Sequence, residues 1–150
     1  MMKTQTKKFI EFRPNAKYIK NVIHKPNLNY KQRECISMAV NEAKKDGIKW
    51  VSGWLVDNYR EDINATTIIH HCWNVDSMGN HYDTLPAQHK HYDYVQDEDV
   101  NKKYNIGKNW YISPVLFLKE DKLVIMIQDG EQREISDEEH LRFKNENTKR

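Results

Sequence analysis

The amino-acid sequence predicts an α+β fold in which one core helix packs against a mainly antiparallel sheet. A single segment around residue 35 has helical apolar spacing, and it precedes a run of segments with strand composition and intervening turn signals. A helix followed by consecutive strands is typical of α+β proteins. The 150 residues can bury a substantial core, so we expect a single domain over residues 1–150.

The core helix is predicted after Pro26, which breaks any longer element. Asn29 can cap the helix, and Gln32 completes a capping-box pattern three positions later. The apolar positions that follow at helical spacing are Cys35, Met38, Ala39 and Ala43. Asp46 and Gly47 supply a signal for the end of the helix.

Short segments rich in strand-forming residues follow the helix, and one precedes it. They are residues 9–12, 48–56, 66–75, 80–84, 111–118, 123–128 and 133–135. The turn signal Asp76-Ser77-Met78-Gly79 separates two of these strands, and polar loops are expected at 57–64 and 87–109. A second capping box that begins at Ser136 predicts a charged C-terminal helix at about 136–147.

The composition excludes several classes of protein. Four Trp, eight Tyr and four Phe argue against a disordered chain, because disordered chains are poor in aromatic residues. The mean hydropathy of −0.93, without an apolar run of about 18 residues, excludes a membrane-spanning helix, so we expect no membrane partner. No apolar segment follows the basic N-terminus, so we expect no signal peptide. Two cysteines are too few for a disulfide framework, which predicts free thiols and a cytoplasmic location.

The N-terminal segment, about residues 1–30, is basic. Residues 1–34 hold nine Lys or Arg and two Asp or Glu, so this segment could contact an anionic partner. The alternative is a solvated arm. Aromatic residues are interleaved with these lysines, namely Phe9, Phe12, Tyr18 and Tyr30. That composition also occurs on proteins that bind single-stranded nucleic acid, so a binding module for nucleic acid or protein is the alternative function.

Three places in the chain could carry chemistry: Cys35 on the predicted helix, the pair His70 and His71 on a strand, and Asp83 on the strand that returns. A cysteine nucleophile needs a base, because a free thiol with a pKa of about 8.5 is mostly protonated at neutral pH. Histidine has the pKa range for this role, and a carboxylate on the other ring nitrogen fixes its tautomer and orientation.

Strand alternation favours His71 over His70 as the base. The side of the strand that carries His71 is the more consistently apolar, so we expect His71 to face the core and the packed helix. Asp83 shares that face if the loop has an odd number of residues, with Gly79 in a left-handed conformation. An even loop or a slip of one residue would move Asp83 to the other face and leave Asp93 and Asp76 as reserve candidates.

A series of short motifs points to a family. In chain order these are Cys35 with Ala39, Val51-Ser52-Gly53-Trp54, His71-Cys72-Trp73-Asn74-Val75, Gly79, and Tyr82-Asp83-Thr84. The series resembles the transglutaminase-like branch of the papain-like cysteine-enzyme superfamily. Members have a Cys at the start of a core helix, a "V-x-G-aromatic" strand, a "His-x-Trp" strand and a strand with an Asp followed by Thr or Pro. The resemblance spans residues 33–86, about a third of the chain.

The resemblance implies Cys35 as nucleophile, His71 as general base and acid, and Asp83 as the orienting group. It implies no metal and no organic cofactor. The expected activity is acyl transfer on a peptide, protein or small amide, with water or an amine as acceptor. Gly53, Trp54 and Trp73 are the candidates for contact with the substrate; the alternatives are a strand kink for Gly53 and core positions for the tryptophans.

Two further interpretations compete with this one. A catalytically inactive member of the same family would act only as a binding module. A zinc site could draw on His70, His71, Cys72, His81, Asp83, His89 and His91. However, adjacent histidines on a strand point in opposite directions, and no Cys-x-x-Cys pair organises the set, so we expect no specific metal site.

Overall fold

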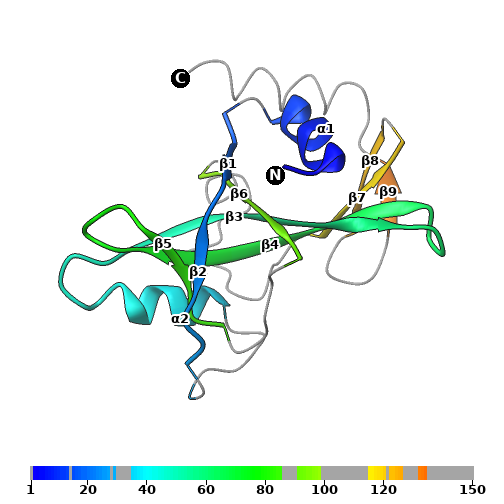
Figure 1. Cartoon of the computed structure of the whole chain (residues 1–150). Coiled ribbons are helices and arrows are strands. Elements are labelled where there is room, and N and C mark those ends of the chain that lie inside the picture. Colours follow the sequence, from blue (N-terminus) through cyan, green and yellow to red (C-terminus); the bar gives the residue numbers. More distant parts are fainter. Residues whose placement is uncertain are drawn as a thin grey trace.

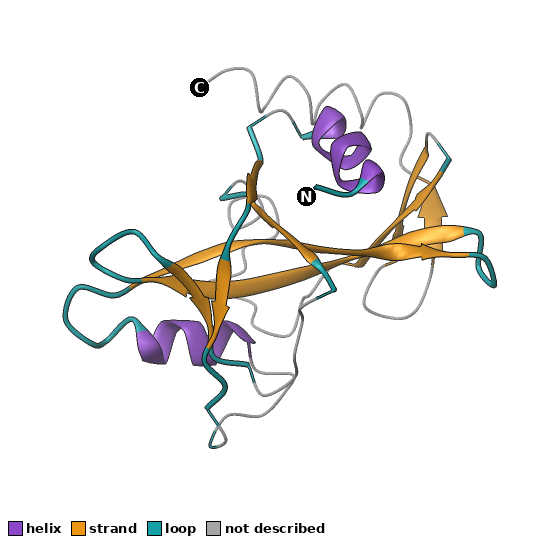
Figure 2. Cartoon of the chain, viewed as in Figure 1, coloured by secondary structure: helices purple, strands orange, loops and turns teal. Residues whose placement is uncertain are grey.

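The computed structural model describes residues 2–13, 15–27, 29, 35–85, 91–98, 115–120, 122–126 and 132–134, and every structural statement below concerns these residues. Two helices and a large, mostly antiparallel sheet make up this part of the chain (Figures 1 and 2). In chain order the elements are α1 Thr4–Phe12, β1 Lys17–Ile19, β2 Val22–His24, α2 Cys35–Glu42, β3 Lys49–Arg60, β4 Ala65–Val75, β5 His81–Asp83, β6 Asp93–Gln96, β7 Val115–Lys119, β8 Lys122–Met126 and β9 Gln132–Glu134.

The long β3–β4 hairpin is the centre of the sheet. Its two strands pair in an antiparallel register that sets Gly53 opposite His71 and Trp54 opposite His70, with one irregularity between Val56 and Tyr59. On the far side of β3 lie β6 and then β1, and from β4 the sheet continues through β7, β8 and β9. All of these pairs are antiparallel.

The strand pairs around this hairpin close into a ring. β4 pairs with β7 through residues 66–69 but with β5 at its other end, through Asn74 and Val75. β5 also pairs with β2 in parallel, and β2 follows β1 after only residues 20 and 21. In Figure 1, β1 and β2 form one extended segment that crosses in front of the hairpin. The ring therefore runs β3, β4, β5, β2 with β1, and β6, and one face of the hairpin points to its inside.

The two faces of the hairpin are buried in different ways. We call the face that carries Trp73 the inner face; its core consists of Val51, Leu55, Trp73 and Tyr94. The outer face carries the larger apolar cluster, which includes Trp54 and Ile68 and extends to Phe9 of α1 and Ala39 of α2. Ring closure thus buries one face, and the two helices bury the other.

The N-terminal segment belongs to this core, so the expectations of a strand at 9–12 and of a solvated arm were wrong. Phe9 is fully buried and meets the Trp54 ring edge to face, with the ring centroids 5.9 Å apart. Thr6 Oγ1 donates a hydrogen bond to Asp93 at 2.6 Å, and the buried Arg13 guanidinium pairs with Asp97 at 2.8 Å. The spacing of Thr6, Phe9 and Arg13 fits one side of a helix, and this tertiary packing outweighs the weak strand pattern.

Several of the other predicted elements are confirmed. The predictions for 48–56, 66–75 and 80–84 correspond to β3, β4 and β5, and those near 111–118, 123–128 and 133–135 overlap β7, β8 and β9. Two loop predictions were partly wrong: β3 continues to Arg60, within the expected loop 57–64, and β6 forms within 87–109. The predicted C-terminal helix at 136–147 lies outside the described residues.

The helix predicted near residue 35 is present as α2, and the turn that follows it includes Gly47 with a φ of +76°. Asn29 was expected to cap this helix, but residues 30–34, which lie between Asn29 and α2, are outside the described part. Among the described helices, neither has the length and apolar character that crossing a membrane requires.

Candidate functional site

A three-residue loop brings Asp83 beside His71. The Asp76 N–H donates to the Asn80 carbonyl at 3.0 Å and closes the loop over residues 77–79, and Gly79 adopts the left-handed φ of +83°. Because β4 and β5 then pair Val75 with His81, Asp83 falls on the same face as His71 and diagonal to it. Of the two alternatives that the sequence left open, the structure has the odd loop, in which Asp83 shares the face of His71.

His71 and Asp83 form a buried hydrogen-bonded pair on the inner face. The His71 Nε2 atom lies 2.8 Å from Asp83 Oδ2, and the two residues are 3% and 2% exposed. The Leu85 N–H donates to the other carboxylate oxygen, Oδ1, at 3.0 Å. The Tyr94 hydroxyl donates to Oδ2 at 2.5 Å. Three donors from three parts of the chain therefore fix the orientation of this carboxylate.

The surroundings of Asp83 keep it ionised. Burial by itself raises the pKa of the carboxyl, but the positive charge of His71, together with the hydrogen bonds from His71, Tyr94 and Leu85, lowers the pKa to about 2. An ionised carboxylate only accepts hydrogen bonds, so His71 must carry a proton on Nε2. In the neutral imidazole the other nitrogen, Nδ1, then has the lone pair that can take up a proton.

Aromatic side chains hold the His71 ring. Trp73, two residues further along β4, is stacked with it at 6.2 Å between centroids and an interplanar angle of 19°. The Trp73 Nε1–H donates to His81 Nδ1 at 2.9 Å, and burial lowers the pKa of His81. Trp73 is 1% exposed. It therefore lies at the predicted site, where it fixes the imidazole as a packing neighbour.

Gly53, which lies opposite His71, allows the strands β3, β4 and β6 to approach one another closely. A Cβ atom at this position would lie 2.0 Å from the Val95 carbonyl oxygen and 2.9 Å from the Trp73 ring. Any larger residue would push β6 or Trp73 away from β3. The close backbone approach that a glycine within a strand signals is present here.

Trp54 lies on the outer face, away from His71 and Asp83. It is fully buried against Phe9, and its Nε1–H donates to Asp97 at 3.0 Å. The expectation that Trp54 contacts a substrate beside His71 is therefore corrected: consecutive strand residues point to opposite faces, and Gly53 takes the inner one.

Cys35 is the first residue of α2, and its side chain lies outside the described part of the structure. The described contacts of α2 are with the outer face: Asn74 Nδ2 donates to the Ala39 carbonyl at 2.9 Å, and the Tyr82 hydroxyl donates to Glu42 at 3.1 Å. The expectation that His71 faces the packed helix was wrong. Both faces of β4 are buried, so its apolar alternation could not distinguish the face covered by a helix from the face inside the ring.

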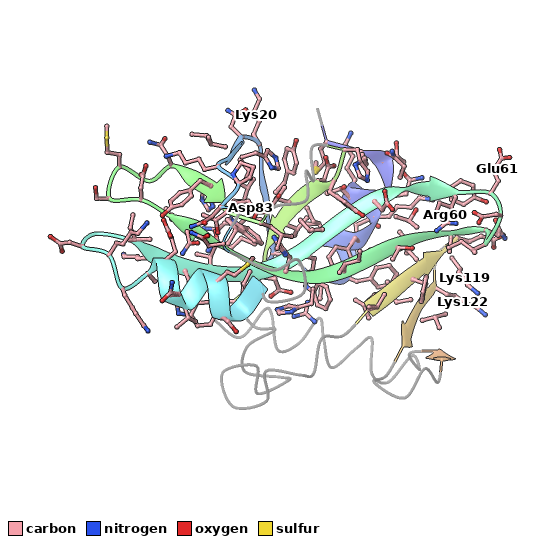
Figure 3. The ribbon with its side chains drawn as sticks, turned by 90° about the horizontal axis from the view of Figure 1, so that it is seen from below. Lys20, Arg60, Glu61, Asp83, Lys119 and Lys122 are labelled. Carbon is pink, nitrogen blue, oxygen red and sulfur yellow. The ribbon has the colours of Figure 1, made fainter. Side chains whose placement is uncertain are left out.

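α2 nevertheless packs against β4, the strand that carries His71. Along one edge of β4 the pairing changes from β7 to β5, between Ile69 and Asn74. In Figure 1 α2 lies under the end of the β3–β4 hairpin at which β5 pairs with β4. Figure 3 shows Asp83 in the crowded interior, far from the charged tip of the hairpin at Arg60 and Glu61.

His70 belongs to a second buried cluster on the outer face. Its Nε2 atom lies 3.1 Å from the Ser52 hydroxyl and 3.8 Å from the Cys72 sulfur, and its ring meets Trp54 edge to face. The prediction that His70 and His71 face opposite sides is confirmed. Strand alternation predicted this opposition, but only the paired register of β3 and β4 identifies Ser52 as a neighbour of His70.

Tyr94 was missed by the sequence analysis. It lies on β6, inside the segment predicted to be a loop, and pairs with Leu55 of β3. The alternation of aromatic residues at Tyr92 and Tyr94 was the only local signal for a strand there. A phenol that donates to the carboxylate of a histidine pair could be found only from the tertiary structure.

The reserve carboxylates have other partners. Asp93 accepts hydrogen bonds from the Lys3 N–H at 2.8 Å and from Thr6, and Asp76 accepts from the Met78 and Asn80 N–H groups at 2.9 Å. Within the described residues, no three His, Cys, Asp or Glu side chains are placed to hold a metal ion together. His89, one of the possible zinc ligands, lies outside these residues.

Comparisons of the chain with protein-family models, with curated proteins and with solved structures gave no match.

Proposed function

We propose that this protein is a cysteine-dependent acyl-transfer enzyme, with Cys35 as nucleophile, His71 as general base and acid, and Asp83 as the group that orients the imidazole. The buried hydrogen bond between His71 Nε2 and Asp83 is the observation that carries this proposal. A histidine oriented by an ionised carboxylate is the arrangement that activates a thiol or hydroxyl nucleophile.

The chemistry follows from the tautomer that Asp83 imposes. His71 Nδ1 takes the proton from the Cys35 thiol, and the thiolate attacks the carbonyl carbon of an amide, ester or thioester. The imidazolium, stabilised by Asp83, returns this proton to the leaving group as the carbon–heteroatom bond breaks, which leaves an acyl-enzyme. Water as the second acceptor gives a hydrolase, such as a peptidase or deamidase, and an amine gives a transferase.

Cys35 lies on α2, a helix that packs against β4, the strand that carries His71. Free-thiol chemistry of this kind also fits a reducing cytoplasm. No step of this mechanism requires a metal or an organic cofactor.

The proposal is tested by alkylation of Cys35 with iodoacetamide as a function of pH. The experiment uses a Cys72→Ala background, because Cys72 is a second thiol, buried on the outer face. We expect a midpoint at least about one pH unit below the value of about 8.5 for a free thiol. His71→Ala should return the midpoint to that value. A midpoint near 8.5 that His71→Ala leaves unchanged contradicts the proposal.

Binding of an anionic partner without catalysis is a second candidate function. The exposed lysines on α1 and on the β1–β2 segment favour it; they are Lys7, Lys8, Lys17, Lys20 and Lys25. Charge reversal of Lys7, Lys8 and Lys17 should abolish binding to single-stranded nucleic acid, and this binding should weaken steeply with salt. Full biological activity of Cys35→Ser, together with its loss in the charge-reversed variant, would favour this function over acyl transfer.

A further inference from the structure

Tyr94 adds a third side chain to the buried hydrogen-bonded network of His71 and Asp83. It lies on β6 and is 3% exposed, although it belongs to neither of the strands that carry the pair. Its ring meets His71 edge to face at 6.1 Å between centroids, and it meets Trp73 in the same way at 5.2 Å. The ring packing therefore fixes the phenol before its hydrogen bond is considered.

The Tyr94 hydroxyl and the His71 ring use the same oxygen of Asp83. Tyr94 donates to Oδ2 at 2.5 Å, and His71 Nε2 lies 2.8 Å from that atom, whereas the backbone N–H of Leu85 occupies Oδ1. Two donors on one oxygen share its negative charge. Each donor therefore weakens the interaction that the other can make with it.

Tyr94 is also held in its donor form. Burial raises the pKa of its hydroxyl, and so do the negative charge of Asp83 and the hydrogen bond to it. The phenol therefore stays protonated across the whole working range of a protein, and its hydrogen bond to Asp83 is present whether or not His71 carries a charge.

We propose that Tyr94 is a positioning residue of the site: it locks the Asp83 carboxylate in the orientation that receives His71, and it limits how strongly that carboxylate retains a proton on the imidazole. The inference rests on the proposed function for its catalytic meaning, but its physical content concerns only His71, Asp83 and Tyr94. A histidine that is bound too tightly as imidazolium would transfer its proton slowly to a leaving group. Tyr94 keeps the imidazole able to give the proton up.

The test is the ring titration of His71, followed by NMR, in Tyr94→Phe and in the wild-type chain. Without the phenol, Oδ2 carries more charge for His71 alone, and we expect the titration midpoint of His71 to rise by about half a pH unit or more. Tyr82→Phe is the matched control, because Tyr82 is also buried and donates to a carboxylate, that of Glu42. This control should leave the His71 midpoint unchanged.

Incorporation of 3-fluorotyrosine provides a second measurement if Tyr94→Phe does not fold. A fluorinated phenol is a stronger donor, so it should lower the His71 midpoint. An unchanged midpoint in Tyr94→Phe, or equal shifts in Tyr94→Phe and Tyr82→Phe, overturns the inference, and so does a rise with 3-fluorotyrosine.

The pH profile of Cys35 alkylation separates this inference from the proposed function. If Cys35 is activated, Tyr94→Phe should shift the profile in parallel with the His71 titration, whereas Tyr82→Phe should not. An unactivated Cys35 in the wild-type chain would end the acyl-transfer proposal, but the His71 titration would still decide the role of Tyr94.

Discussion

His70 and His71 are consecutive residues on one strand, equally buried, and yet they occupy chemically different surroundings. His71 points inside the strand ring to an ionised carboxylate that a phenol and a backbone N–H also hold. His70 points to the helix-covered face, where its ring bonds to the neutral hydroxyl of Ser52 and lies near Cys72. Equal burial thus goes with different surroundings, and burial by itself does not identify a candidate catalytic histidine.

The largest expected effect comes from breaking the inner pair. Asp83→Ala removes the acceptor for His71, Tyr94 and the Leu85 N–H, and it leaves buried polar groups without that partner. We expect a loss of about 3–5 kcal/mol in the free energy of unfolding, measured by urea denaturation. A loss below about 1 kcal/mol would show that the network contributes little to stability.

The pH dependence of stability should also reveal this pair. The folded pKa of Asp83, about 2, is below the ordinary value of 3.8, so between these values the unfolded chain binds a proton that the folded chain does not. This contribution, about 2 kcal/mol, should be complete above about pH 5 and should be lost as the pH falls toward 2.

Urea midpoints at several values between pH 6 and pH 2 measure this contribution as the difference between the wild-type chain and Asp83→Asn. The difference cancels the titration of other carboxylates that the two chains share. Parallel stability curves for the two chains would contradict the assignment of the low pKa to Asp83.

The smallest of these effects is expected on the outer face. Ser52→Ala removes the hydroxyl beside His70, a single hydrogen bond between neutral groups, and should cost about 1 kcal/mol in urea denaturation. The pH profile of Cys35 alkylation should not change. A change in that profile as large as the one expected for His71→Ala would mean that His70, and not His71, acts on the thiol.

The sequence was sufficient to predict the local part of the site. The turn chemistry of Gly79 and the alternation of β4 and β5 determine that His71 and Asp83 share a face, because hairpin register depends on neighbouring residues. The strand composition of residues 48–56 and 66–75 likewise predicted the two strands β3 and β4.

The other features depend on contacts between distant segments. No local pattern in the sequence signals that β1 and β2 close the ring. Without knowledge of this closure, either face of β4 could be the one that packs against the helix. The N-terminal helix follows from the packing of Phe9 on Trp54, 45 positions further along the chain, and the role of Tyr94 follows from β6. Patterns within one segment could not reveal any of these contacts.

Alkylation of Cys35 in His71→Ala and in His70→Ala, both in the Cys72→Ala background, compares the two histidines directly. We expect His71→Ala to raise the alkylation midpoint to about 8.5, the value for a free thiol, and His70→Ala to leave the low midpoint in place. Equal midpoints in the two variants, or a rise in His70→Ala alone, would contradict the central claim that the carboxylate-bound histidine activates the thiol.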